Sequence, residues 1–477
     1  MSFDLIFYKR KDNPISKAMR KLSDVPAIAV ALIVVFNILI SSAFAQDNIT
    51  VLKGGTIIDL ENFGKSSNDI KNGVVIIQRG KITAVGSLGK IKIPPSATVV
   101  DVSGKYIVPG LIEGFGSVAK QSFANAYLYM GVTTVVTVED DRRGKTFTDA
   151  SPSPALYKQD AIWGSDRVEV TGKPYRFENI NYYNDAALKY EIDSMAKAGA
   201  RVMLIHYGVK PEQLKAIIEA CKAHHIATVG ELGFTNYREA VLAGVQSFVH
   251  TSRYTADILP DSVRKIYSNA PFGPPASFYY QYITKPDILT DKTLLQLAAL
   301  YGTHKVGLMP TESLLVYTNM PFAKNPWNER VASIIDEKDI IHEPLDKATG
   351  KWKNPSPMRE KAAPVLFAMD SVFIRSGAHF LTGSGATAFG TMPGISLHTE
   401  LEVLSHAGLN NREVIAAATN NFSLLWDWKH IGKIEAGRDA NILVLSADPL
   451  ESLENLKKIE ILMLQGKRID REQLLKK

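Results

Sequence analysis

Two histidines that could bind a metal ion or move a proton end strand-like segments in the middle of the chain. His206 ends the apolar run 200–206, and His250 ends the short run 247–250. Imidazole nitrogens and carboxylate oxygens are the ligands that zinc takes in hydrolytic sites. A third ligand would have to come from an acidic segment elsewhere: Glu231, Glu312 or the pair His342-Glu343. The alternative is that both histidines are hydrogen-bonded structural residues.

A serine nucleophile is the second chemistry to consider. Ser384 lies between two glycines, Gly383 and Gly385. Such a serine needs a neighbouring base to take its proton, and the sequence identifies none. The tripeptide is also common in turns. The single cysteine, Cys221, excludes an intrachain disulfide and a cysteine-rich metal site.

Composition indicates a globular protein and argues against nucleic-acid binding. The chain has 477 residues, of which 45% are hydrophobic and 22% charged, with a formal net charge of +6. Half of this excess lies in the first 45 residues. The remainder has no Lys/Arg cluster with interleaved aromatic residues, so a nucleic-acid partner is excluded.

The N-terminal segment has the pattern of a secretory signal. The apolar run Val25–Ile40 follows basic residues and leads to Ala43-Phe44-Ala45, which has the small-x-small form of a cleavage site. We therefore expect residues 1–45 to be a signal peptide, and the protein to reach the bacterial periplasm or the outside of the cell. The alternative is an uncleaved N-terminal membrane anchor. Because the basic region is long, translation could start at Met1 or at Met19.

The rest of the chain predicts an α/β protein with a β domain built from both ends. Residues 46–108 contain short strands, among them a hairpin over 73–86 with its turn at Arg79-Gly80. Residues 109–431 alternate apolar strands with helical patterns, which favours a (β/α)₈ barrel of the TIM type. Residues 432–477 return to strands, which we expect to join the first ones. Two segments poor in periodicity, 253–290 and 311–360, are expected to cover one end of the barrel.

Four motifs in order resemble the metal-dependent amidohydrolase superfamily, most closely its imidazolonepropionase- and prolidase-like branch. They are an opening strand (Val51–Asp59), the entry to the first barrel strand (Gly104–Ile112), the last barrel helices (Pro393–Glu402 and Glu413–Asn420) and a closing segment (Gly432–Leu445). The resemblance spans about residues 49–470 and implies a metal-assisted hydrolase of carbon–nitrogen bonds. A shared fold does not establish shared chemistry, so each site position needs its own comparison.

At the positions that the resemblance assigns to metal ligands and to the catalytic aspartate, most of the required side chains are missing. The two His-x-His positions fall on Phe115 and Ser117, the Lys position on Leu204, the third histidine on Gly230 and the aspartate on Ser384. The fourth histidine falls on His250 and is retained. A catalytic zinc normally takes three or more protein ligands, so we expect no bound metal cofactor. The loop that follows the His-x-His is also shortened here.

The alternative is a rebuilt site for a divalent metal such as zinc around His206 and His250. Strand alternation puts His206 on the same face as Leu204, but gives Glu231 the opposite face from Gly230. The leading hypothesis is an exported amidohydrolase-like protein without the catalytic metal site, acting as a binding or partner subunit. It would form a homo-oligomer, or a hetero-oligomer with an intact relative. The other hypotheses are a hydrolase of non-peptide carbon–nitrogen bonds or small peptides, and a small-ligand binder.

Overall fold

The computed structural model describes residues 49–140, 143–164, 168–170, 173–175, 184–269, 276–314, 316–341 and 344–476. The expected signal peptide or anchor and the pair His342-Glu343 lie outside these ranges. Across the described ranges, no helix is both long enough and apolar enough to cross a membrane.

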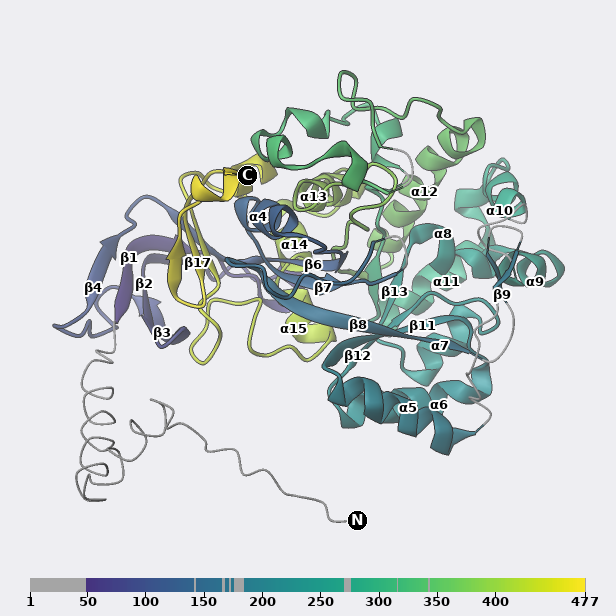
Figure 1. Ribbon diagram of the computed structural model, residues 1–477, viewed down its shortest axis with the longest axis horizontal. Coiled ribbons are helices and arrows are strands. Elements are labelled where there is room, and N and C mark those ends of the chain that lie inside the picture. Colours follow the sequence, from purple (N-terminus) through teal and green to yellow (C-terminus); the bar gives the residue numbers. More distant parts are fainter. Residues whose placement is uncertain are drawn as a thin grey trace, which may run out of the picture. The chain divides into compact units, whose positions relative to one another are not determined.

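A curled sheet of eight parallel strands forms the centre of the structure (Figure 1). Neighbouring strands in the sheet follow chain order: β6 (Leu111–Gly116), β7 (Val132–Thr137), β8 (Ala155–Gly164), β11 (Ala200–Gly208), β12 (Ala227–Gly230), β13 (Ser247–Val249), β14 (Gly307–Met309) and β15 (His379–Phe380). Two backbone hydrogen bonds join β6, one edge of the sheet, to the segment that follows β15 at the other edge. The N–H of Gly114 donates to Thr382 O at 2.9 Å, and that of Gly385 donates to Phe115 O at 2.8 Å.

Helices connect most of these strands and pack on the outside of the sheet, as the strand–helix alternation predicts (Figure 1). They are α4 (Gln121–Tyr129), α5 (Asp185–Lys197), α6 (Leu214–Ala223), α7 (Tyr237–Ala243), α11 (Lys292–Thr303) and α12 (Pro357–Arg375). Three more follow β15: α13 (Ile395–Ala407), α14 (Asn411–Ala417) and α15 (Asn420–Leu425). α4 begins five residues after β6 ends, so the connection between them is short.

Local sequence signals explain where the helices begin and end. Asn236 caps α7, because its side chain accepts the N–H of Glu239 while Glu239 accepts the N–H of Asn236. Gly244 ends the same helix with a φ of 99°, a left-handed conformation that favours glycine. Asn410 and Glu413 repeat the same reciprocal cap at α14.

Strands from both ends of the described chain share a second sheet (Figure 1). Its members are β1 (Thr50–Ile57), β2 (Ile70–Gln78), β3 (Lys81–Ser87), β4 (Thr98–Asp101), β5 (Tyr106–Pro109), β16 (Ile442–Leu445), β17 (Ile459–Leu464) and β18 (Lys467–Ile469). Antiparallel pairing of β5 with β16 joins the two ends. The β2–β3 hairpin turns at Arg79 and Gly80 as expected, with φ angles of 52° and 78° that match a tight hairpin turn.

Long connections follow β13 and β14, where the sequence is poor in periodicity. The first contains α8 (Thr251–Tyr254), α9 (Asp261–Asn269) and α10 (Ala276–Ile283). The second contains four 3₁₀ turns, at Tyr317–Asn319, Pro326–Asn328, Arg330–Ile334 and Glu337–Asp339. These connections leave the carboxyl ends of β13 and β14, so they lie at the end of the sheet where His250 is placed.

Candidate functional site

The inner face of the curled sheet is filled by apolar side chains. Phe115 from β6 and Leu204 from β11 are each 5% exposed and belong to one buried cluster with side chains from the other strands. These two side chains have no atom that can bind a metal ion. Phe115 also packs edge-on against the imidazole of His250, with the ring centres 5.3 Å apart. Two of the expected ligand positions are therefore part of the hydrophobic core.

Gly230 is the next position without ligand chemistry, and its surroundings leave no room for a histidine. A Cβ atom at Gly230 would lie 2.7 Å from the ring of Phe248, well inside van der Waals contact. Val229 belongs to the inner apolar cluster, so strand alternation directs residue 230 outward and Glu231 inward. The expectation that Glu231 lies on the face of the strand away from the histidines is therefore wrong.

Ser384 is hydrogen-bonded to Glu113, a base that the sequence did not identify. Its Oγ donates to Glu113 Oε2 at 2.6 Å, and its N–H donates to Oε1 at 2.7 Å. Both residues are fully buried, and the carboxyl group of Glu113 lies near the hydroxyl of Tyr127 on α4. Burial raises the pKa of Glu113 to about 7 against these hydrogen bonds. The arrangement links β6 to the segment after β15 rather than presenting a nucleophile.

Three side chains that could do chemistry do come together at the carboxyl ends of β11, β12 and β13. Glu231 Oε2 lies 3.5 Å from His206 Nε2, and Glu231 Oε1 lies 3.7 Å from His250 Nε2. Glu231 and His206 are each 4% exposed, and the side chain of His250 is 18% exposed. Glu312, the other candidate carboxylate, instead hydrogen-bonds to Asp370.

The hydrogen bonds of His250 define which of its nitrogens is available. The hydroxyl of Thr311 donates to Pro310 O at 2.6 Å, so its oxygen is left to accept from His250 Nδ1, also at 2.6 Å. Nε2 then carries the lone pair and faces Glu231. His250 and Thr311 both have positive φ angles, 66° and 55°, a conformation that is uncommon outside glycine.

His206 is the most enclosed of the three groups. Its ring lies 3.6 Å from that of Trp163 between ring centres, and its Nδ1 is buried without a hydrogen-bond partner. Burial, together with the nearby positive charge of Arg253, lowers the pKa of His206 well below its usual value. The same two causes, burial first, lower the pKa of His250 to about 3. Both imidazoles are therefore neutral at physiological pH.

Arg253, which the sequence analysis did not single out, supplies the fixed positive charge of the site. Its Nε lies 3.7 Å from Glu231 Oε1, and its Nη1 donates to the hydroxyl of Tyr267 at 2.6 Å. The hydroxyl of Tyr207 donates to Glu231 as well. Arg253 lies on α8, directly after His250 at the N-cap of that helix, and its partner Glu231 comes from the end of β12, so spacing along the sequence gives no signal for the pair.

The described residues do not fit the metal centre that the fold family implies. Phe115 and Leu204 are core residues, the hydroxyl of Ser384 is used by Glu113, and Ser117 offers only a neutral hydroxyl, buried without a partner. Among the described residues, no group of three or more His, Cys, Asp and Glu side chains is arranged to hold a metal ion. The guanidinium of Arg253 already lies 3.7 Å from the carboxylate of Glu231. A metal ion bound at this carboxylate would be repelled by the positive charge of Arg253, because like charges interact strongly in a buried site.

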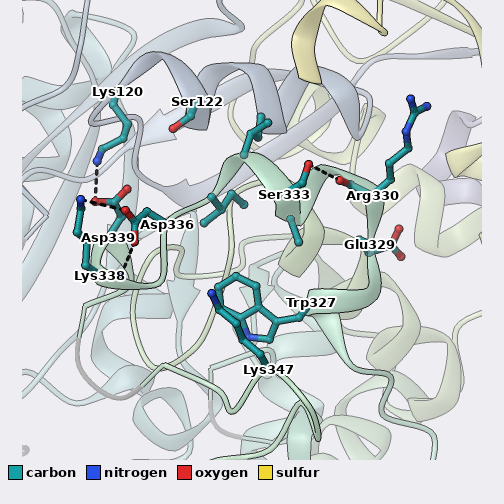
Figure 2. Close-up of a pocket in the computed structure, with 13 residues that line it drawn as sticks. Lys120, Ser122, Trp327, Glu329, Arg330, Ser333, Asp336, Lys338, Asp339 and Lys347 are labelled. Atoms are coloured by element: carbon teal, nitrogen blue, oxygen red, sulfur yellow. Dashed lines mark hydrogen bonds and ion pairs between the residues drawn. The ribbon is translucent and has the colours of Figure 1, made fainter. Parts of the chain in front are cut away.

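A pocket of about 770 Å³ lies elsewhere, between the start of α4 and the 3₁₀ turns (Figure 2). Its charges are paired: Lys120 Nζ lies 2.6 Å from Asp339, and Lys338 Nζ lies 2.9 Å from Asp336 (Figure 2). The lining contains neither histidine nor cysteine. The pocket therefore offers no imidazole or thiol, and two of its carboxylates, Asp336 and Asp339, are held in ion pairs with lysines.

Comparison with known proteins supports the fold. The chain has a TM-score of 0.59 with bottromycin amidohydrolase (15% identity, covering 98% of this chain and 92% of that one). The score is 0.58 with molinate hydrolase (15% identity, covering 90% and 96%) and 0.57 with a Xaa-Pro dipeptidase (15% identity, covering 89% and 100%). At this identity the likeness shows the fold alone.

Sequence comparison gives one local match. The chain is 32% identical over 96 residues to adenine deaminase 1 of Desulfotalea psychrophila, which is 19% of this chain and 15% of that protein. No family model matches the chain. The structural neighbours are enzymes of the amidohydrolase superfamily, as the sequence motifs predicted.

Proposed function

We propose that this chain, which has the amidohydrolase fold, has lost the catalytic metal site of that superfamily and acts as a non-catalytic binding or partner subunit. The observation that carries the proposal is the packing of Phe115 and Leu204 in the apolar core at two expected ligand positions. A side chain that fills the core cannot be exchanged for a ligand without rebuilding its surroundings. The hydrogen bonds from β6 to the segment after β15 support a closed (β/α)₈ barrel as its scaffold.

The proposed setting is outside the cytoplasm, with a homologous chain as partner. The signal-like segment 1–45 supports export, and cleavage would leave residues 46–108 and 432–477 as one β domain around the barrel at 109–431. A barrel surface shared with relatives can pair with a second copy of the chain or with an intact amidohydrolase.

Turnover and binding measurements together test this proposal. The mature protein, supplied with Zn²⁺ or Mn²⁺, is assayed against dipeptides, N-acyl amino acids and cyclic imides, and binding of the same compounds is measured by calorimetry. We expect no hydrolysis above the uncatalysed rate. Metal-dependent turnover of any of these substrates would overturn the proposal, whereas binding without turnover would identify the ligand class.

A second candidate is a hydrolase with a rebuilt site, which the approach of Glu231 to both His206 and His250 favours. In that case His250 Nε2 or Glu231 would take the proton of the attacking water, which requires the group to reach within about 3 Å of it. Any hydrolytic activity should then be lost in His206→Ala or His250→Ala. An unchanged rate in both variants would exclude this group as the active site.

A further inference from the structure

Three buried carboxyl groups from three different elements meet behind His250. Glu312 lies just after β14, Asp370 on α12 and Glu400 on α13, and they are 2%, 1% and 0% exposed. Among the described residues, no Lys, Arg or His forms an ion pair with any of them. Carboxylates taken out of water without a cation are costly in their charged form, so this cluster is suited to binding protons.

Hydrogen bonds tie the cluster to α8. Asp370 accepts from the hydroxyl of Thr251 at 3.0 Å and from that of Tyr254 at 2.7 Å. Glu312 is hydrogen-bonded to Asp370, while its Oε1 is buried without a partner. Two carboxyl groups can share a hydrogen bond only when one of them carries the proton, so at least one of this pair is neutral.

Glu400 holds the backbone of the same segment. It accepts the N–H of Glu312 at 3.1 Å and that of Ser313 at 2.9 Å, one on each carboxyl oxygen. It also faces Asp370 closely enough for the two charges to affect each other. In the part of the chain that the structure describes, the hydroxyls of Tyr254 and Tyr279 also face the cluster.

Burial raises the pKa of all three acids. It raises that of Asp370 to about 7 and that of Glu400 to about 8, against their hydrogen bonds. The pKa of Glu312 is raised further by burial and by the neighbouring charge of Asp370. The charge on the cluster therefore changes at mildly alkaline pH.

The two segments joined by this cluster also carry the candidate site. His250 precedes Thr251, Thr311 precedes Glu312, and a hydrogen bond joins His250 to Thr311. Any movement that separates Thr251 from Glu312 will therefore strain the bond that orients His250. The imidazole of His250 and the carboxyl cluster therefore lie next to each other, and both connect the segment that contains Thr251 to the segment that contains Glu312.

We propose that Glu312, Asp370 and Glu400 form a proton-controlled latch that holds the segments carrying His250 and Thr311 together. When the cluster is neutral, its hydrogen bonds keep α8, α12 and the end of β14 in contact. When protons are lost, two or three like charges repel one another in a buried site and the segments open. The latch concerns the conformation of the site, and it holds whether or not the metal site has been lost.

Hydrogen exchange of the amides of Glu312 and Ser313 tests the latch directly. Between pH 6.5 and 8.5, after correction for intrinsic exchange, the opening constant of the wild type should rise by up to about tenfold per pH unit for each proton released. In Glu312→Gln the amide mimics the neutral acid and can still donate to Asp370. The opening constant of this variant should therefore increase by about tenfold less per pH unit than that of the wild type. An equal rise in both proteins would overturn the proposal.

The choice of variants keeps the result interpretable. An amide at position 400 would set an N–H against one of the two backbone donors, so Glu400→Gln would disturb the fold and is not used. Glu360→Gln, on the exposed surface of α12, is the matched control and should keep the wild-type pH dependence. If Glu312→Gln does not fold, the wild type alone decides, because flat opening constants from pH 6.5 to 8.5 would contradict the latch.

Discussion

At the scale of single residues, a buried charge pair lies beside the two histidines of the candidate site. Arg253 and Glu231 lie 3.7 Å apart, and tyrosine hydroxyls bond to each of them. Removal of one member of a buried pair leaves the other without compensation, which costs more than the loss of an exposed pair. The stability of this region should therefore depend on both charges.

Glu231→Gln should lower the free energy of unfolding by about 3 kcal/mol, because the guanidinium of Arg253 loses its counter-charge in a buried environment. Unfolding in urea, followed by circular dichroism, measures the change. Glu219→Gln, on the exposed face of α6, is the control and should change stability by no more than about 0.5 kcal/mol. A loss below about 1 kcal/mol in Glu231→Gln would mean that the pair does not stabilise the site.

The buried histidines should make the protein sensitive to acid. The folded pKa values of His206 and His250 are lowered, so the unfolded chain binds more protons than the folded chain below about pH 6.5. Their contribution to stability is complete above pH 6.5 and is lost as the pH falls towards 3. In His206→Gln the loss of stability between pH 6 and 4 should be less steep, by about one proton. An unchanged slope in urea unfolding would contradict this assignment.

Residue types alone identify side chains that cannot bind a metal, but they do not predict the contacts that those side chains make. Residue types alone show that Phe115 and Leu204 cannot bind a metal. Arg253 and Glu113 could not be assigned, because their partners Glu231 and Ser384 come from distant segments that only the tertiary fold brings close. The face of Glu231 was misjudged because the alternation was counted from Gly230 rather than from the apolar residue Val229.

At the scale of the elements, each parallel strand directs alternate residues into the curl or towards the helices. This alternation explains why residue 230 faces Phe248, where an added side chain would overlap the ring. The repeated strand–helix order and the hairpin turn at Arg79-Gly80 could both be predicted from periodicity and turn residues. Where loops fold over the site could not, because their sequence has no periodic pattern.

Gly230→Ala should destabilise the protein by about 1–3 kcal/mol, because the added methyl group overlaps the ring of Phe248. Thermal unfolding of the single variant and of Gly230→Ala with Phe248→Leu makes the comparison. The loss of stability in the double variant should be smaller than the sum of the losses in Gly230→Ala and in Phe248→Leu alone. Additive losses would show that the contact between residue 230 and the ring is not the cause.

Ser384→Ala tests the link between β6 and the segment after β15. Glu113 would keep the donors from the backbone but lose the hydroxyl of Ser384, so the free energy of unfolding should fall by about 1–3 kcal/mol. Ser333→Ala, at an exposed position in the second long connection, is the control. If ligand binding or turnover were lost while stability stayed unchanged, Ser384 would be a functional group instead.

At the scale of the whole molecule, the chain has the fold of its amidohydrolase neighbours, and Phe115 and Leu204, two positions where the resemblance places metal ligands, lie in the apolar core. The central claim is therefore that the mature protein takes up no catalytic metal.

Metal content of the purified mature protein tests this claim most directly. The protein is exposed to Zn²⁺ and Mn²⁺, freed of loosely bound ions by gel filtration and analysed by elemental mass spectrometry, with His206→Ala and His250→Ala in parallel. We predict far less than one metal ion per chain, with no difference between the variants and the wild type. One tightly held metal ion per chain that disappears in both variants would contradict the claim and identify His206 and His250 as ligands of a rebuilt centre.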